Sequence, residues 1–236
     1  MLKKGIFLAS STVASFITPF ISTSVNIALP TIAKSFNISV AFVNWFVNVF
    51  LISMASTILF FGVVADWFGK ERIFVAGVMI FAVTALLTPY INNFAYLLIL
   101  RGIQGLGAAM ISGTAVAILT SLFPKKIGFV IGINTTAVYV GTTLGPVLGG
   151  FLVDYAGWTS LFILSGTFAL ISFIFSLLFL SFTRKQGSKP PNFQSLFVFM
   201  GSIILVSVSF TYVSSIYGLM TMFLGLVLLM FALHIE

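Results

Sequence analysis

The chain has 236 residues, of which 60% are apolar and only 6% are Asp, Glu, Lys or Arg. A soluble domain carries about 25% charged residues, so this composition could not cover a water-facing surface and excludes a soluble globular protein. The net charge is +7, but the charged residues lie between apolar runs. They therefore do not indicate a nucleic-acid-binding domain.

Apolar stretches long enough to cross a membrane recur along the chain. A hydrocarbon core of about 30 Å needs about 20 apolar residues in a helix. We therefore predict an all-α polytopic membrane protein with spans at residues 5–29, 41–64, 73–90, 95–120, 128–153, 159–181, 194–212 and 217–235. A signal peptide is the alternative for the first stretch, which follows Lys3 and Lys4, but its apolar part is longer than the about 7–15 residues of a signal peptide.

The connections between these spans differ in charge. With the N-terminus inside, Lys34 alone falls on the outer side, and the other basic residues of the connections fall on the inner side: Lys3, Lys4, Lys70, Arg72, Lys125, Lys126, Arg184, Lys185 and Lys189. Basic residues concentrate on the cytoplasmic side of membrane proteins. The sequence predicts cytoplasmic termini for a multi-pass protein of the plasma membrane.

The connection after the second span combines a carboxylate with two cations. Asp66 lies between Gly62 and Gly69, and Lys70 and Arg72 follow. Gly62 permits close approach of another helix, and Gly69 permits a tight turn. This pattern is typical of a charged latch on the cytoplasmic face, and an ordinary interfacial loop is the alternative.

The fourth span contains Arg101, the one charged residue well inside an apolar stretch. A charge there is costly and normally faces a cavity or a polar partner, and Gln104 one turn along could share that face. Snorkelling to the outer headgroups is the alternative. Small residues at four-residue spacing predict close helix packing along the same span: Gly105, Ala109, Gly113 and Ala117.

The fifth span contains a doubled small-residue repeat. Gly141, Gly145 and Gly149 recur every four residues, with Pro146 and Gly150 beside them. The glycines predict a smooth packing face, and Pro146 predicts a bend because it removes a backbone hydrogen bond.

Taken in order, these three segments resemble the signatures of the major facilitator superfamily. Residues 62–72 are similar to its cytoplasmic G-x-L-A-D-R-x-G-R-K motif, residues 101–109 to its R-x-x-Q-G-x-G-A-A motif, and residues 141–150 to its antiporter motif G-x-x-x-G-P-x-x-G-G. Residues 25–30, Trp45 with Phe50 and Leu51, residues 157–162 and the last two spans resemble the branch of fourteen-helix drug:proton antiporters.

The resemblance implies roles for individual residues. Asp66 would latch the cytoplasmic face, and Arg101 would organise a substrate cavity and take part in proton coupling. Asn26 and Gln104 are further cavity candidates. The antiporter motif would shape a bend through its glycines and proline: Gly141, Gly145, Pro146, Gly149 and Gly150.

Three departures from the family pattern affect these roles. Trp67 replaces an Arg, Glu71 replaces a cation, and Ile21 stands where the first helix often has an Asp. None of the predicted spans contains Asp or Glu, and an arginine does not release its proton. Proton coupling would therefore need a carboxylate from elsewhere.

The domain organisation follows from the longest connection, which is basic and contains Pro190 and Pro191. We expect a six-helix bundle at residues 1–182, a cytoplasmic linker at 183–192 and two additional spans at 193–236. Facilitators rock two six-helix halves around a midplane site, so we expect this chain to be a fragment or to pair with a separate C-terminal half.

Transport of a small molecule by alternating access is the function that these features favour, most simply as part of a proton-coupled exporter of drugs or amphipathic solutes. The alternatives are a facilitator for a sugar, metabolite or ion, and a truncated membrane protein that transports nothing. We expect no enzyme activity, cofactor, metal or nucleic-acid partner, because Cys is absent, His234 is the sole histidine and no phosphate-binding loop is present.

Overall fold

The computed structural model describes residues 2–179, 192–211 and 216–235. These residues form the following helices: α1 (Leu2–Phe36), α2 (Val40–Val43), α3 (Trp45–Phe68), α4 (Lys70–Leu87), the 3-10 turn η1 (Thr88–Tyr90), α5 (Phe94–Leu122), α6 (Ile127–Ala156), α7 (Thr159–Phe179), α8 (Phe193–Thr211) and α9 (Ile216–Ile235). Within the described ranges, seven helical stretches are long and apolar enough to cross a membrane, and Ile216–Ala232 is a shorter apolar helix. The prediction of an all-α polytopic membrane protein is confirmed.

The predicted end of the first span was wrong. The span was placed at residues 5–29, but α1 continues through Pro30 to Phe36. Its end is set by Asn37, which has φ 51° and lets the N–H of Ile38 bond to the Ala33 carbonyl at 3.0 Å. A left-handed residue of this kind closes a helix by satisfying its last carbonyls, and Asn tolerates that conformation better than most residues.

The latch segment is not an extended loop. Helix α3 runs to Phe68 and α4 begins at Lys70, so only Gly69 separates the two helices. Gly69 has φ 107° and ψ 124°, a conformation that a side chain would oppose. The helices extend into the polar residues because they continue beyond the hydrocarbon region, where hydropathy no longer marks their ends.

The same extension changes the position of the acidic residues. The prediction that no span contains a carboxylate holds for the apolar stretches, but Asp66 lies in α3 and Asp154 lies in α6, each within the last turns of its helix. Both side chains are exposed. Neither of these acids is therefore placed in the interior of the bundle.

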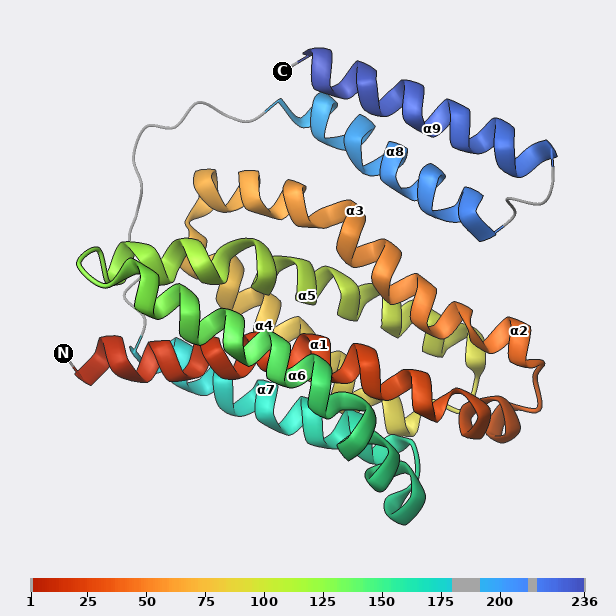
Figure 1. The fold of residues 1–236 in the computed structure, drawn as a ribbon, viewed down its shortest axis with the longest axis horizontal. Helices are drawn as coiled ribbons and strands as arrows, with labels where there is room; N and C mark the ends of the chain where they lie inside the picture. Colours follow the sequence, from red (N-terminus) through yellow and green to blue (C-terminus); the bar gives the residue numbers. More distant parts are fainter. Residues whose placement is uncertain (1, 180–191, 212–215, 236) are drawn as a thin grey trace.

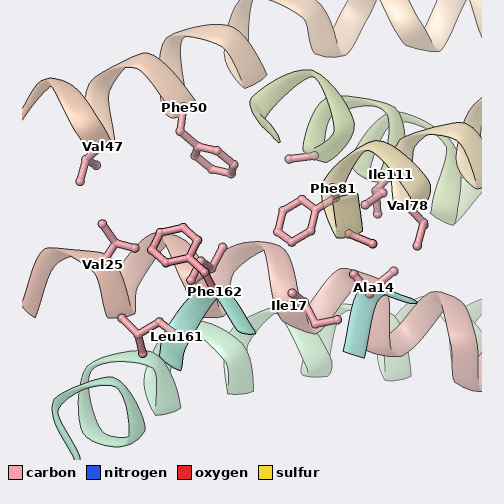
Figure 2. Packing of buried hydrophobic residues seen from close by; sticks show 14 of the residues in the cluster. Ala14, Ile17, Val25, Val47, Phe50, Val78, Phe81, Ile111, Leu161 and Phe162 are labelled. Carbon is pink, nitrogen blue, oxygen red and sulfur yellow. The ribbon is translucent and has the colours of Figure 1, made fainter. Parts of the chain in front are cut away.

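Helices α1 and α3–α7 pack around a core of Phe, Ile, Val, Leu and Ala side chains. Figure 2 shows Phe50 from α3 and Phe162 from α7 pointing into the same space, with Ile17 from α1 and Phe81 from α4 farther along the core. Glycines allow some of these helices to touch closely. A Cβ on Gly107 of α5 would lie 2.8 Å from the Gly77 carbonyl oxygen of α4, so the two backbones meet there.

Helices α8 and α9 lie side by side at one edge of the bundle, along α3 (Figure 1). Ring contacts join α8 to α3: Phe197 lies 5.8 Å from Phe60, and Phe193 lies 6.1 Å from Trp67, between ring centroids. The predicted linker 183–192 falls outside the described residues except for Asn192, as does the C-terminal residue Glu236. The division of the chain into these parts stays a prediction.

Candidate functional site

Helix α5 places Arg101 in the interior of the bundle. The side chain is fully buried. Its Nε donates a hydrogen bond of 3.0 Å to the Phe46 carbonyl of α3, and its Nη1 donates one of 2.8 Å to Oε1 of Gln104. Gln104 is also buried. The pair that the sequence predicted to share one face of α5 is brought together, and Arg101 points into the protein and away from the lipid.

Three aromatic rings surround the guanidinium. Its central carbon lies 4.4 Å from the ring centroid of Phe50, 4.8 Å from Phe46 and 5.6 Å from Phe162. Rings at these distances attract a cation through their negative faces. Among the described residues no Asp or Glu forms a salt bridge with Arg101, and Nη2 of Arg101 and Nε2 of Gln104 are buried without a hydrogen-bond partner. Ring faces and one carbonyl therefore take the place of a counter-ion.

An open groove of 540 Å³ lies between α1, α3, α5 and α6. Its lining alternates small polar and apolar side chains and contains no charged residue: Ser15, Thr18, Pro19, Ser22, Thr23, Leu51, Met54, Ser112, Ala115, Val116, Asn134, Thr135, Val138 and Tyr139. Arg101 and Gln104 are not part of this lining. A solute in the groove would meet neutral polar groups and no charged side chain.

Asn134 is the functional candidate that the sequence interpretation missed. It lies in α6, is 5% exposed and lines the groove, and its Oδ1 is buried without a hydrogen-bond partner. The signal in the sequence is an amide inside an apolar span, a costly group that normally finds a partner.

Asn26 lies near one end of the groove on α1 and is exposed. Its Nδ2 donates to the Ser22 carbonyl at 3.3 Å, and the Ser22 side chain lines the groove. Asn26 itself is not among the lining residues. Its cavity role stays a prediction.

The latch residues gather at the junction of α3 and α4. Asp66 Oδ1 lies 3.0 Å from Nζ of Lys70, one turn along and across Gly69. Arg72 is exposed. A second groove, of 390 Å³, runs between α3 and α5 at this junction, with Asp66, Lys70 and Gly62 in its lining together with Ile58, Leu59, Val63, Gly113 and Ala117.

The glycines of the fifth span hold α6 against α1. The Gly145 carbonyl accepts a hydrogen bond of 2.8 Å from the Ser24 hydroxyl, and a Cβ on Gly149 would lie 2.7 Å from Cβ of Ser24. A Cβ on Gly141 would likewise clash with the Phe16 carbonyl oxygen of α1. Helix α6 stays continuous through Pro146. The predicted smooth face is therefore an α1–α6 contact, and the bend with its role in exchange stays a prediction.

A buried serine cluster ties α1 to α7. The Ser10 hydroxyl lies 2.8 Å from the Ser172 carbonyl and 2.8 Å from the Ser176 hydroxyl, and the Ser172 hydroxyl donates to the Ser10 carbonyl at 2.9 Å. Elsewhere in the described ranges no group of three or more His, Cys, Asp or Glu side chains comes together to hold a metal.

Comparison with known proteins finds a family and individual proteins that this chain resembles. The family model described as Major Facilitator Superfamily matches residues 12–235. The riboflavin transporter RibZ of Clostridioides difficile is 32% identical over 181 residues, which is 76% of this chain and 40% of that protein. The tetracenomycin C resistance and export protein of Streptomyces glaucescens is 32% identical over 187 residues, 79% of this chain and 34% of that protein.

One further relative matches a shorter segment of the chain, and one solved structure matches its fold. The multidrug resistance protein Stp of Mycobacterium tuberculosis is 39% identical over 140 residues, 58% of this chain and 26% of that protein. The crystal structure of the POT family transporter PepTSo covers 98% of this chain and 51% of its own with a TM-score of 0.72 at 16% identity, which shows a shared fold. The chain thus spans well under half the length of these curated relatives.

Proposed function

The chain belongs to the major facilitator superfamily, and from that premise we propose that it is the N-terminal part of an exporter of drugs or other amphipathic small molecules. It is a multi-pass membrane transporter component and not an enzyme. The export proteins among its relatives support the direction of transport.

The groove between α1, α3, α5 and α6 carries this proposal. Its volume of 540 Å³ is within the range of small-molecule sites, about 300–1,000 Å³. Leu51, Met54 and Val116 give it apolar surface, and hydroxyl and amide groups interrupt that surface. Such a mixture suits a solute that is part apolar and part polar.

A second half would close this groove. The curated relatives are more than twice as long as the segment they share with this chain, and in alternating access two halves rock around a midplane site. We infer that six further helices, which form a C-terminal half, cover the groove. The groove at Gly62 and Asp66 would receive a helix of that half and latch the cytoplasmic face.

The proposed setting is the plasma membrane with both termini in the cytoplasm, on the basis of the distribution of Lys and Arg. Proton coupling belongs to the same proposal. Because Arg101 has no carboxylate beside it and does not itself titrate, the proton-carrying acid would come from the C-terminal half.

A facilitator for another solute is the second candidate. The similarity to a protein named as a riboflavin transporter and the uncharged lining of the groove favour it. The two candidates differ in the solute and share the groove and the cycle.

Dye transport into inverted membrane vesicles tests the proposal. Vesicles with this chain alone would be compared with vesicles that also contain a C-terminal facilitator half, before and after a protonophore. We expect ATP-independent, protonophore-sensitive accumulation only with both halves. Accumulation that ignores the protonophore would contradict proton coupling, and no accumulation of any solute with both halves would contradict transport.

A further inference from the structure

A further groove, of 670 Å³, lies between α1, α6 and α7. It contains no charged side chain, and apolar side chains from all three helices line it: Val13 and Phe16 of α1, Phe129, Ile133 and Val140 of α6, and Phe168 of α7. Phe129, Val140 and Phe168 are exposed in this chain. Exposed apolar side chains in membrane-spanning helices are stable only against an apolar neighbour, so the α1–α6–α7 groove calls for an apolar occupant.

Helix α6 separates this groove from the proposed solute groove. Asn134 and Val138 line the solute groove, whereas Thr136 and Val140, each two residues farther along α6, line the α1–α6–α7 groove. Two residues correspond to about 200° around an α-helix, so the two grooves lie on opposite sides of α6. A partner that covers the solute groove does not for that reason cover the α1–α6–α7 groove.

The dimensions of the α1–α6–α7 groove match one leaflet of a membrane. Gly128 and Gly132 line it one turn apart on α6, and no atom lies within 4 Å of a Cβ built on either glycine. No other described part of the chain therefore fills this end of the groove. From Gly128 to Val140 the groove follows α6 for about 18 Å, at about 1.5 Å of rise per residue. This length is comparable to half of a hydrocarbon core of about 30 Å, which is the depth that a lipid acyl chain occupies.

Exposed cations lie at the glycine end of the groove. Lys125 and Lys126 directly precede α6, and both are exposed. Lys4 lies near them, because its Nζ donates a hydrogen bond of 2.8 Å to the Leu122 carbonyl. Among the described residues no Asp or Glu forms a salt bridge with any of these three lysines. The end of the groove therefore offers positive charge to an anion at the membrane surface.

We propose that the α1–α6–α7 groove binds an anionic phospholipid from the leaflet on the basic side of the membrane. One acyl chain lies between Phe16, Phe129 and Phe168, and the phosphate lies at Lys125 and Lys126. A neutral lipid or an apolar helix would fill the groove and leave these cations without an anion. The proposal depends neither on the solute nor on the direction of transport.

Lipid binding to the purified full chain in detergent tests this proposal, with native mass spectrometry as the measurement. Dioleoylphosphatidylglycerol and dioleoylphosphatidylcholine have the same acyl chains and differ in headgroup charge. We expect the anionic lipid to bind at least roughly tenfold more tightly, since each lysine near an anionic headgroup contributes roughly fivefold. Glycerol 3-phosphate carries the phosphate without acyl chains and should not displace it.

Variants assign the two ends of the lipid to the two parts of the site. We expect Lys126→Gln to reduce the preference for the anionic lipid roughly fivefold. Lys34→Gln removes an exposed lysine from the other end of α1 and should keep the preference. Gly132→Leu places a side chain in the groove and should weaken the binding of both lipids at least tenfold. Gly201→Leu is its matched control, because a Cβ on Gly201 of α8 also has no atom within 4 Å.

Circular dichroism checks that each variant is folded, and Gly128→Leu repeats the test one turn away if Gly132→Leu unfolds. Equal affinities for the two lipids, or displacement by glycerol 3-phosphate, would overturn the proposed ligand. An equal loss of preference in Lys34→Gln, or undiminished binding by a folded Gly132→Leu, would overturn the proposed site. Loss of lipid binding when a C-terminal half is added would identify the groove as a surface between the halves. The vesicle experiment tests transport independently of each of these outcomes.

Discussion

Arg101 and Gln104, three residues apart on α5, are joined by a hydrogen bond of 2.8 Å from Nη1 to Oε1 in the interior of the bundle. Both side chains are buried, and each retains a nitrogen without a partner. A buried charge that lacks a counter-ion is a poor source of stability. The pair therefore indicates a role in transport more than a role in stability. Substitution of Arg101 distinguishes these two roles.

Replacement of Arg101 by Leu should remove transport and keep the fold. The Phe46 carbonyl lies within α3 and does not depend on Arg101, and removal of the guanidinium ends the cost of burying it. We expect the unfolding temperature in detergent to stay the same or rise, with dye export from the completed carrier reduced at least tenfold. The double variant Arg101→Leu with Gln104→Leu also removes the Gln104 oxygen that the single variant leaves without a donor, and should be at least as stable as the single variant. Unchanged export would show that Arg101 has no role in transport.

Gly149 and Gly150 are adjacent, but the same substitution should cost much more stability at Gly149 than at Gly150. A Cβ on Gly149 would lie 2.7 Å from Cβ of Ser24, but a Cβ on Gly150 would have Ile27 Cγ2, at 3.8 Å, as its nearest neighbour. We expect Gly149→Val to push α6 from α1 and cost about 1–3 kcal/mol, and Gly150→Val to cost much less. Thermal unfolding of the two variants gives the comparison. Similar losses for both would mean that α6 does not pack on α1 through this face.

Substitution of Gly62 tests whether a partner helix packs into the groove beside Asp66. No atom lies within 4 Å of a Cβ built at this position, so a larger side chain can be added without a clash in this chain. We expect Gly62→Ala to be neutral or to stabilise α3 by up to about 1 kcal/mol, since Ala favours a helix over Gly. Gly62→Leu should fold as well as Gly62→Ala and yet block transport by filling the groove. Full transport by a folded Gly62→Leu carrier would exclude helix docking here.

Ser10 should contribute more to stability than an exposed serine of the same helix. Its removal leaves the buried Ser176 hydroxyl without a partner and breaks a link between α1 and α7. We expect Ser10→Ala to cost about 1–2 kcal/mol. Ser35 is exposed and donates only to the Thr31 carbonyl, so Ser35→Ala is the matched control and should cost less than about 0.5 kcal/mol. Equal unfolding temperatures for the two variants would contradict a stabilising serine cluster.

The sequence was sufficient for the class of fold and for the positions of the helices. Twenty or so apolar residues in a row leave few choices in lipid, because each backbone polar group must be paired within its own helix. The ends of the helices were harder to predict from the sequence. Hydropathy falls where the helix leaves the hydrocarbon, but α1 and α3 continue as helices to Phe36 and Phe68, where Asn37 and Gly69 adopt positive φ.

The candidate site needed the tertiary structure. The sequence could show that Arg101 lies in an apolar span with Gln104 nearby, and that the glycines of α6 share a face. It could not show that Phe46, Phe50 and Phe162 enclose the guanidinium, since these rings come from α3 and α7. Nor could it show that Asn134 is among the residues that line a neutral groove and Arg101 is not. Local hydropathy decides whether a residue is in the membrane, and only the packing of helices distant in sequence decides what each face of the residue meets.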